Sequence, residues 1–205
     1  MPIINMVYKK KKPRKREPSA NTLAYYPLKI DWNEASWKSW YDIQGQTSIS
    51  FSEWVANFYS SSAYFWTSIA WFKTMSLWVY KDSAGGAIIW WDGSVNYYIY
   101  IDADNFNGVE ISANWNYTLW SIQSWQRRHL VIISNWYLKC YIDWQVTWTQ
   151  NWANIGWSAK WLWNRDNRNS GRYKWKMSEL IFEDRERAAD EVLAYYNQTK
   201  ANYWL

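Results

Sequence analysis

Short runs rich in Tyr, Ile, Val and Thr recur along the chain from Asn21 onward, and turn-forming residues separate them at fairly even spacing. Such runs are typical of β-strands joined by tight turns, and many short strands at regular spacing favour two packed sheets. We therefore predict an all-β fold, a two-sheet antiparallel jelly-roll sandwich. The predicted strands are Thr22–Leu28, Thr47–Phe51, Tyr64–Phe72, Ala87–Trp91, Tyr97–Ile101, Gly108–Ser112, Arg128–Ser134, Tyr137–Ile142 and Tyr173–Phe182.

The spacing of apolar residues adds one helix and one buried thiol. Val192, Tyr195 and Tyr196 recur at helical spacing, which predicts a short C-terminal helix over Ala188–Asn197. In the strand Tyr137–Ile142 apolar side chains alternate with others, and Cys140 falls on the apolar face. We therefore expect half-buried strands, with Cys140 a small buried hydrophobe rather than a reactive thiol.

Positive charge is concentrated in a basic N-terminal arm. The formal net charge is +5, and removing seven clustered cations leaves 5 − 7 = −2 for the remainder. We predict a disordered arm over residues 1–20 and one domain over residues 21–205. The arm could bind a polyanion such as nucleic acid, contact a virion subunit, or serve as a solubilising or packaging element. Its candidate polyanion-binding residues are Lys9, Lys10, Lys11, Lys12, Arg14, Lys15 and Arg16.

Tryptophan replaces glycine where a β-protein normally turns. The chain has 21 Trp and only 7 Gly, whereas average usage would give roughly 14 Gly in a chain of this length. Trp follows Asn or Asp in pairs such as Asn135-Trp136 and Asp143-Trp144. A type I′ turn requires positive φ at both central residues, which suits Gly and disfavours Trp.

Our hypothesis is that most of these tryptophans are glycines in the source, encoded by a reassigned UGA codon, a recoded stop codon. Trp71, inside an apolar run, and one of Trp90 and Trp91 have the features of true tryptophans, and Trp161 stays undecided. The alternative is a naturally Trp-rich protein that presents aromatic platforms to its ligand.

Several features of the sequence exclude particular classes of protein. One cysteine excludes a disulfide framework and a multi-cysteine zinc site. The chain has no apolar stretch long enough to predict a transmembrane helix. A charge run follows the short N-terminal apolar segment directly, so we expect no cleavable signal peptide. An extracellular surface or a virion is the expected setting, and the absent signal favours a phage particle.

An ordered set of short motifs runs along the chain. They are Leu23-Ala24-Tyr25-Tyr26-Pro27-Leu28, Asp31-Trp32-Asn33-Glu34-Ala35-Ser36-Trp37, Ser68-Ile69-Ala70-Trp71-Phe72-Lys73, Gln126-Arg127-Arg128-His129-Leu130-Val131, Tyr141-Ile142-Asp143-Trp144, Trp163-Asn164-Arg165, Tyr173 through Leu180, and Arg185 with Asp190-Glu191-Val192 and Tyr195-Tyr196. This set resembles the laminin-G-like, or concanavalin A-like lectin and glucanase, family of bacterial and phage proteins. Reading Trp as Gly improves the match at Trp37, Trp144, Trp163 and Trp175. Arg127 departs from the pattern, because the family has an aromatic residue there.

The resemblance implies a binding fold, and the residues give little sign of catalysis. Glucanases of this family carry E-x-D-x-x-E on one strand, and no predicted strand has that spacing. Glu183, Asp184 and Glu186 cluster at the predicted start of the helix, where acids are favourable and solvated. His129, the only histidine, is interpreted as structural. We therefore expect no enzyme.

Calcium is the one cofactor that the resemblance suggests. The oxygen-rich segment Asp102–Glu110 lacks EF-hand spacing and is interpreted first as a hairpin loop. Because this family can hold calcium at its rim, the candidate metal ligands are Asp31, Asp102, Asp104 and Asp166.

Two loops combine amides, carboxylates and aromatic rings, the groups that bind sugars. The candidate ligand-binding residues are Asp92, Asn96, Tyr97, Asn164, Asp166 and Asn167. We expect a non-catalytic recognition module for a carbohydrate or a cell-surface partner. The alternative is a structural phage or assembly protein whose basic arm contacts nucleic acid or another subunit.

Overall fold

The computed structural model describes residues 19–27, 45–47, 49–52, 55–58, 64–66, 69, 72–81, 87–91, 97–102, 108–113, 116–121, 127–151, 161–163 and 175–203. Within these residues fifteen strands form two antiparallel sheets, and a helix with a short 3₁₀ turn follows them. No described helix is long and apolar enough to cross a membrane.

The first sheet, sheet A, has the strand order β13-β12-β11-β6-β15-β4-β3, and β1 also pairs with β15. Its strands are β1 (Thr22–Tyr26), β3 (Ile49–Ser52), β4 (Val55–Phe58), β6 (Thr74–Lys81), β11 (Arg127–Ser134), β12 (Tyr137–Ile142), β13 (Gln145–Asn151) and β15 (Trp175–Glu183).

The second sheet, sheet B, has the order β10-β9-β8-β7-β14-β5-β2. Its strands are β2 (Gly45–Thr47), β5 (Tyr64–Trp66), β7 (Ala87–Trp91), β8 (Tyr97–Asp102), β9 (Gly108–Ala113), β10 (Asn116–Ser121) and β14 (Trp161–Trp163). The predicted all-β sandwich is confirmed.

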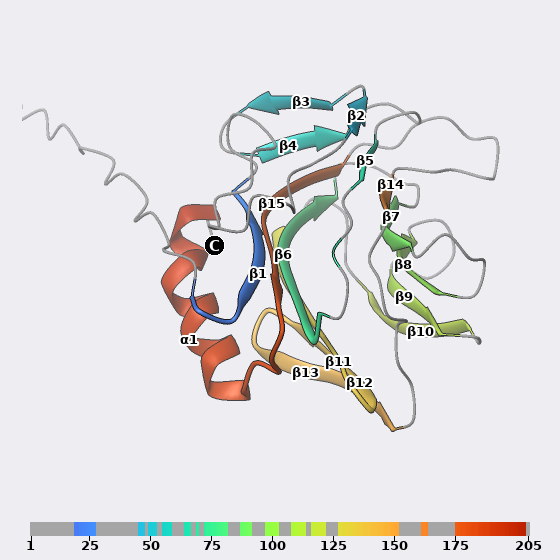
Figure 1. Cartoon of the computed structure of the whole chain (residues 1–205), viewed down its shortest axis with the longest axis vertical. Coiled ribbons are helices and arrows are strands. Elements are labelled where there is room, and N and C mark those ends of the chain that lie inside the picture. Colours follow the sequence, from blue (N-terminus) through green and yellow to red (C-terminus); the bar gives the residue numbers. More distant parts are fainter. Residues whose placement is uncertain are drawn as a thin grey trace, which may run out of the picture.

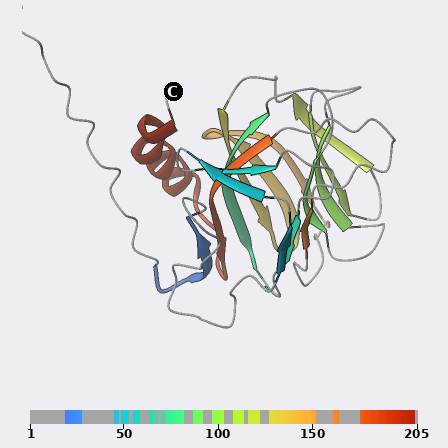
Figure 2. The ribbon, with the colours of Figure 1, turned by 90° about the horizontal axis from the view of Figure 1, so that it is seen from above.

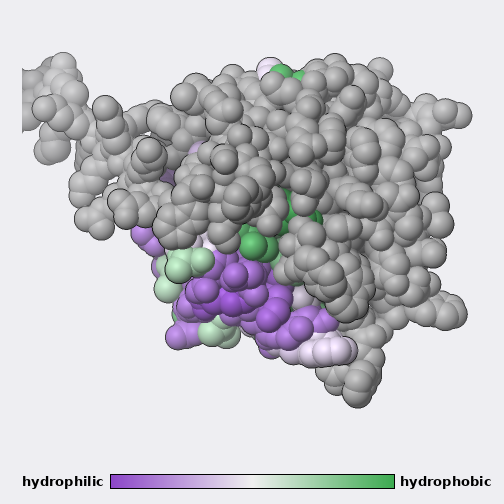
Figure 3. All heavy atoms as spheres, in the orientation of Figure 1, coloured by the Kyte–Doolittle hydropathy of each residue, from purple (hydrophilic) through white to green (hydrophobic). Residues whose placement is uncertain are grey.

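Three layers follow one another in space. Figure 1 and Figure 2 show α1 (Ala189–Thr199) against the outer face of sheet A, and sheet B on the opposite side of sheet A. The 3₁₀ turn η2 (Lys200–Tyr203) continues α1. Hydrophilic side chains gather on the outer surface around α1 (Figure 3). Sheet A is therefore covered on both faces, which explains its burial.

The central strands of sheet A are buried along both faces. Residues 74–79 of β6 and residues 129–134 of β11 are all buried. Apolar side chains such as Leu77 and Leu130 alternate with the side chains that face α1. On the α1 side, Val131, Ile133 and Tyr141 pack against Val192. The expectation of half-buried strands is thus wrong for the middle of sheet A, because α1 covers the second face. Cys140 is buried as predicted.

Most predicted strands occur near their predicted positions. β7 and β12 have the predicted bounds, and β1, β8, β9, β11 and β15 differ by one or a few residues. The prediction of one strand over Tyr64–Phe72 is wrong: β5 ends at Trp66, and Ile69 and Phe72 are buried outside any strand. The prediction missed β6, the central strand of sheet A, and also β4, β10, β13 and β14.

Helix α1 begins one residue after its predicted start and ends two residues after its predicted end. The Glu191 carboxylate accepts a hydrogen bond from the Ala188 backbone N–H at 2.8 Å and two from the Arg185 guanidinium, both at 2.7 Å. The guanidinium and the helix amide hold the pKa of Glu191 down at about 2. Glu191 therefore fixes the start of the helix as a charged carboxylate.

Two-residue turns join β11 to β12 and β12 to β13, at Asn135-Trp136 and Asp143-Trp144. Among the described non-glycine residues, only Asp143 and Glu179 have positive φ, 60° and 50°. The predicted positive φ at both central turn residues is thus present at Asp143 and wrong for Asn135, Trp136 and Trp144. Trp136 is 76% exposed and Trp144 is 46% exposed. Both indoles lie at the surface because the turns carry them out of the sheet.

The described chain begins at Ser19, inside the segment predicted to be the arm. The Ser19 and Thr22 hydroxyls lie 3.1 Å apart, and the Thr22 backbone N–H donates to the Ser19 carbonyl at 3.0 Å. This turn leads directly into β1. The arm cations Lys9 to Arg16 lie outside the described residues, so the prediction about them stays a prediction.

Candidate functional site

The two predicted ligand loops are mostly outside the described residues. Asp92, Asn96, Asn164, Asp166 and Asn167 all lie there. Tyr97 begins β8 and pairs with Ala113 of β9. The sugar-binding prediction for these loops is therefore untested.

Most of the predicted calcium ligands also lie outside the described residues. Asp31, Asp104 and Asp166 lie outside the described residues. Asp102 ends β8 opposite Gly108 of β9, at the other end of the strand from Tyr97. Within the described part of the chain, no three side chains of His, Cys, Asp or Glu gather in a way that could hold a metal ion.

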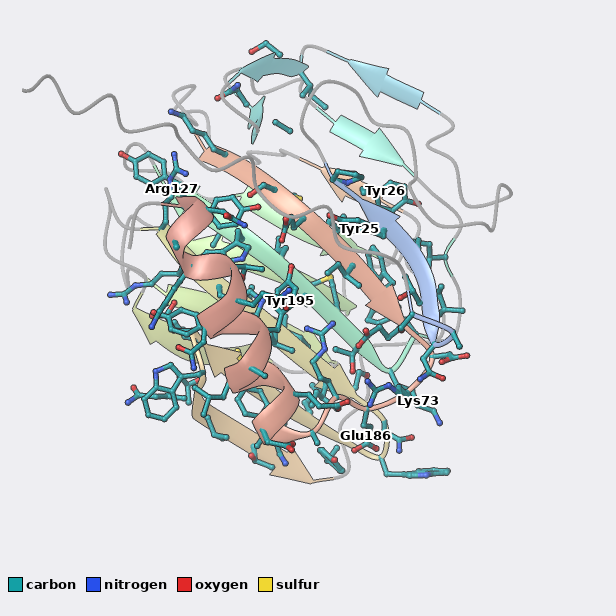
Figure 4. The ribbon with its side chains drawn as sticks, turned by 90° about the vertical axis from the view of Figure 1, so that its left-hand side faces the viewer. Tyr25, Tyr26, Lys73, Arg127, Glu186 and Tyr195 are labelled. Carbon is teal, nitrogen blue, oxygen red and sulfur yellow. The ribbon has the colours of Figure 1, made fainter. Side chains whose placement is uncertain are left out.

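His129 lies in the covered face of sheet A, between aromatic rings and a serine. Its ring lies 5.0 Å from the Trp78 ring and 5.0 Å from the Tyr195 ring. Figure 4 shows Tyr195 on α1, on the side of the helix that faces the sheet. The His129 Nε2 is 2.9 Å from the Ser76 Oγ, and Nδ1 is 3.3 Å from the Asp143 carbonyl oxygen.

A hydrolytic triad also contains a serine hydroxyl in contact with a histidine ring, and the Ser76–His129 pair shares only this contact with it. A carbonyl oxygen can only accept, so Nδ1 donates to Asp143, and Nε2 makes the contact with the Ser76 hydroxyl. Arg187 Nη1 donates to the same Ser76 Oγ at 3.3 Å. Both Ser76 and His129 are fully buried. The pair therefore joins β6 to β11 under α1, in keeping with the structural interpretation of His129.

The acids before α1 are not all solvated, contrary to the sequence interpretation. Glu183 is fully buried, and its carboxylate meets the buried Arg187 guanidinium at 3.0 Å through two pairs of atoms. The Arg187 guanidinium also lies 5.1 Å from the centre of the Tyr195 ring. Only Asp184 of the three acids is exposed. Glu183 and Arg187 form a buried ion pair that fastens the end of β15 beneath the helix.

Glu186 joins the β11–β12 turn to the start of α1. Its carboxylate accepts hydrogen bonds from Asn135 Nδ2 at 2.5 Å and from the Tyr137 hydroxyl. Burial raises the pKa of Glu186, but these two donors and the nearby Lys73 outweigh it, so the pKa is lowered. The hydrogen bond to Glu186 and burial together raise the pKa of Tyr137 to about 12. Figure 4 places Lys73 and Glu186 together at the N-terminal end of α1.

A row of two cations and a tyrosine crosses sheet A at the other end of the helix. Tyr80 of β6 is the register partner of Arg127 on β11 and of Lys176 on β15. The Arg127 guanidinium lies 5.8 Å and the Lys176 ammonium 5.3 Å from the centre of the Tyr80 ring. All three side chains are partly exposed. In Figure 4 Arg127 lies beside the C-terminal end of α1. We call these three residues the cation–tyrosine row.

The aromatic residues under η2 close the neighbouring part of this face. Trp78 is buried, stacks on Tyr203 at 4.8 Å and on Tyr196 at 5.8 Å, and donates its indole N–H to Thr199 Oγ1 at 3.2 Å. Burial, with the nearby Glu179 carboxylate, raises the pKa of Tyr203 well above its usual value. The side chains around Trp78 are covered, so the row beyond them is the open end of this face.

Known proteins share this fold and not its sequence. No family profile and no curated protein matches the sequence. Domain 4 of AbnA, a GH43 extracellular arabinanase from Geobacillus stearothermophilus solved with arabinotriose, is similar with a TM-score of 0.64 at 13% identity. That comparison covers 85% of this chain and 97% of the arabinanase domain.

Parts of two larger proteins have a fold similar to that of this chain. The binding domain of botulinum neurotoxin serotype D is similar with a TM-score of 0.67 at 10% identity, over 86% of this chain and 51% of that one. Trypanosoma rangeli sialidase in complex with sialic acid is similar with a TM-score of 0.67 at 10% identity, over 90% of this chain and 34% of the sialidase. The chain thus spans between a third and a half of these two proteins. Together these likenesses show that the two-sheet β-sandwich of this chain recurs in proteins of unrelated sequence.

Proposed function

We propose that this protein is a recognition module that binds carbohydrate, at a cell surface or on a virion. The likeness to the arabinanase domain carries the proposal, because it extends over nearly all of that domain, which was solved with a bound arabinose trisaccharide. The likeness to the neurotoxin binding domain points the same way. A shared fold can host unrelated functions, so the ligand has to come from binding measurements.

We propose further that the module is not catalytic. The burial of Ser76 and His129 supports this, since neither could touch a substrate. The pairing of Glu183 with Arg187 supports it as well, because that carboxylate is engaged in an ion pair. Hydrolysis of an arabinan or glucan panel by the purified chain would overturn this part of the proposal.

The laminin-G-like affiliation and the recoded glycines belong to the same proposal. Trp136 and Trp144 are exposed at two-residue turns, so no packing requires an indole there, although neither residue has the positive φ that would demand glycine. Trp78 is different, because it is buried and its indole N–H is bonded. We expect UGA codons at Trp136 and Trp144 and a UGG codon at Trp78. Trp71 lies outside the described residues, and only the backbone is described for Trp90, Trp91 and Trp161.

The alternative function is structural: the sandwich would pack against other subunits of a phage particle, and the arm would contact nucleic acid or a subunit. The seven cations between Lys9 and Arg16 favour this alternative. Calcium at Asp31, Asp102, Asp104 and Asp166 stays a proposal that belongs to the first function.

A glycan array separates the two functions. The full chain and a chain lacking residues 1–18 should bind the same glycans with the same affinity if the sandwich recognises carbohydrate. Binding that disappears with the arm would support the structural alternative. Repeating the array with a calcium chelator tests the metal, because a rim site would make binding depend on calcium.

A further inference from the structure

The cation–tyrosine row is laid out by the strand register. β6 lies between β11 and β15, and Tyr80 pairs with Arg127 on one side and with Lys176 on the other. Register partners project from the same face of a sheet, so the three side chains point the same way. Adjacent strands are about 4.8 Å apart, which puts the backbones of Arg127 and Lys176 roughly 10 Å from each other. Both charged groups lie over the same Tyr80 ring, so one short oligosaccharide can reach both of them.

The two cations of the row differ from the arginines near them. Arg128, Arg185 and Arg187 each form an ion pair with a carboxylate, those of Asp143, Glu191 and Glu183. Within the part of the chain that the structure describes, Arg127 and Lys176 contact aromatic rings and have no carboxylate partner. A site with two unneutralised cations that are partly exposed attracts anions.

Tyr80 keeps the two cations in place without neutralising them. Its ring attracts each cation through the ring quadrupole. The Arg127 guanidinium also lies 6.0 Å from the Tyr203 ring, on the buried side of the row. The N–H groups of a guanidinium are arranged to bind a carboxylate through two parallel hydrogen bonds, which a lysine cannot reproduce.

We infer that the row Lys176–Tyr80–Arg127 binds the carboxylates of an acidic glycan. This inference rests on the proposed carbohydrate-binding function and specifies its ligand class. Arg127 holds a sugar carboxylate through its fork, and Lys176 neutralises the next acidic sugar along the chain. The third nearby cation, Lys200, lies 5.3 Å from the Tyr196 ring and extends positive charge along α1. Two or three cations fit a short acidic oligosaccharide better than a long duplex, which requires many phosphate contacts.

The test compares charged and uncharged forms of one polymer. The probes are polygalacturonate, its fully methyl-esterified form, hyaluronan, alginate, polysialic acid and double-stranded DNA. The protein is full-length, with the seven arm cations either unchanged or replaced by glutamine, because the arm itself attracts polyanions. At least one acidic glycan should bind in both backgrounds, and esterified polygalacturonate should not bind.

Three variants locate the site. Arg127→Gln and Lys176→Gln should each weaken binding to the acidic glycan about tenfold, the effect of losing one charged contact. Arg127→Lys, which keeps the charge and loses the fork, should give an intermediate loss. The matched control is Lys139→Gln: Lys139 also lies over a tyrosine, 5.2 Å from the Tyr137 ring, at the other end of the same face and should change binding less than twofold. Thermal melting of each variant verifies that it is folded.

Each contrary outcome has a distinct meaning. If Arg127→Gln and Lys139→Gln weaken binding equally, or if none of the acidic glycans binds, the inference is wrong. If only neutral glycans bind, with an affinity that Arg127→Gln leaves unchanged, the inference is overturned and the proposed function stands. A chain that binds no glycan at all, acidic or neutral, would overturn both. DNA bound through Arg127 as tightly as the glycans would identify a general polyanion surface instead of a glycan site.

Discussion

Replacing tryptophan by glycine should have opposite consequences at two positions of sheet A. Trp136 is 76% exposed at the β11–β12 turn, whereas Trp78 is 2% exposed beneath α1 and η2. If Trp136 stands where the source has glycine, Trp136→Gly should leave the free energy of unfolding almost unchanged. Trp78→Gly should remove much of it, because Trp78 joins the sheet to the C-terminal helix.

The magnitudes follow from burial. Truncating a buried tryptophan to alanine costs about 3–5 kcal/mol, and glycine in a strand interior costs roughly 1 kcal/mol more, so Trp78→Gly should cost about 5 kcal/mol. A tryptophan covers at most about 250 Å². A quarter of that area at about 25 cal/mol per Å² gives an upper limit of about 1.5 kcal/mol for Trp136→Gly. Trp136 has no positive φ that glycine would relieve, so no backbone gain offsets this, and we expect a loss of about 1 kcal/mol.

Urea unfolding followed by circular dichroism measures both changes. Because Trp78→Gly can abolish folding, Trp78→Phe is the milder variant: it keeps the ring stacking and loses the hydrogen bond to Thr199 Oγ1. It should cost about 1–2 kcal/mol, and Thr199→Val should reproduce part of the loss. A loss above about 2 kcal/mol for Trp136→Gly, or full stability of Trp78→Phe, would refute the reasoning.

Three further predictions concern ionisable groups of sheet A and α1. Glu183→Gln should destabilise the protein by about 3–5 kcal/mol because it leaves the Arg187 charge buried and unpaired, and Glu183→Leu with Arg187→Met should recover most of that loss in urea unfolding. The pKa of Glu191 is held at about 2 in the folded protein, below its unfolded value of about 4.3. The ionised Glu191 therefore stabilises the folded protein fully above about pH 4.3, and this contribution is lost as the pH falls towards 2. The difference in melting temperature between the protein and Glu191→Gln should shrink over that interval, and a constant difference would contradict this. Burial raises the pKa of Cys140 to about 12, so a thiol reagent at pH 8 should modify Cys140 only after denaturant unfolds the protein, and rapid labelling without denaturant would contradict this.

The class of fold could be predicted from the sequence because its signals are local. Alternating apolar residues and turn-forming pairs identified β12 and the turns on both sides of it. The residues Val192, Tyr195 and Tyr196 identified α1, and two of them are buried against sheet A. These signals depend on neighbours within a few residues, so one sequence suffices to detect them.

The strand β6 was missed because its pattern depends on partners far away in the chain. Thr74 and Ser76 are polar, but they lie under α1: Thr74 Oγ1 donates to the Arg185 carbonyl at 2.7 Å, and Ser76 contacts His129. A strand whose polar side chains are buried by a helix more than a hundred residues later does not resemble a half-buried strand. The burial of Glu183 was missed for the same reason, since its partner Arg187 is buried only when α1 is in place.

The same dependence on register explains why the cation–tyrosine row could not be found from the sequence. Arg127 was recognised as a departure from the resembling family, but nothing local relates it to Tyr80 or Lys176, which lie 47 and 49 residues away. Antiparallel pairing of β11, β6 and β15 brings the three side chains to one face, and a register shift of one residue would send Tyr80 to the opposite face. The register is fixed by the buried partners of the adjacent rows, Trp78 with His129 and Leu77 with Leu130. The covered part of sheet A therefore determines the geometry of its exposed end, so a substitution at Trp78 should weaken glycan binding through the row without touching the ligand.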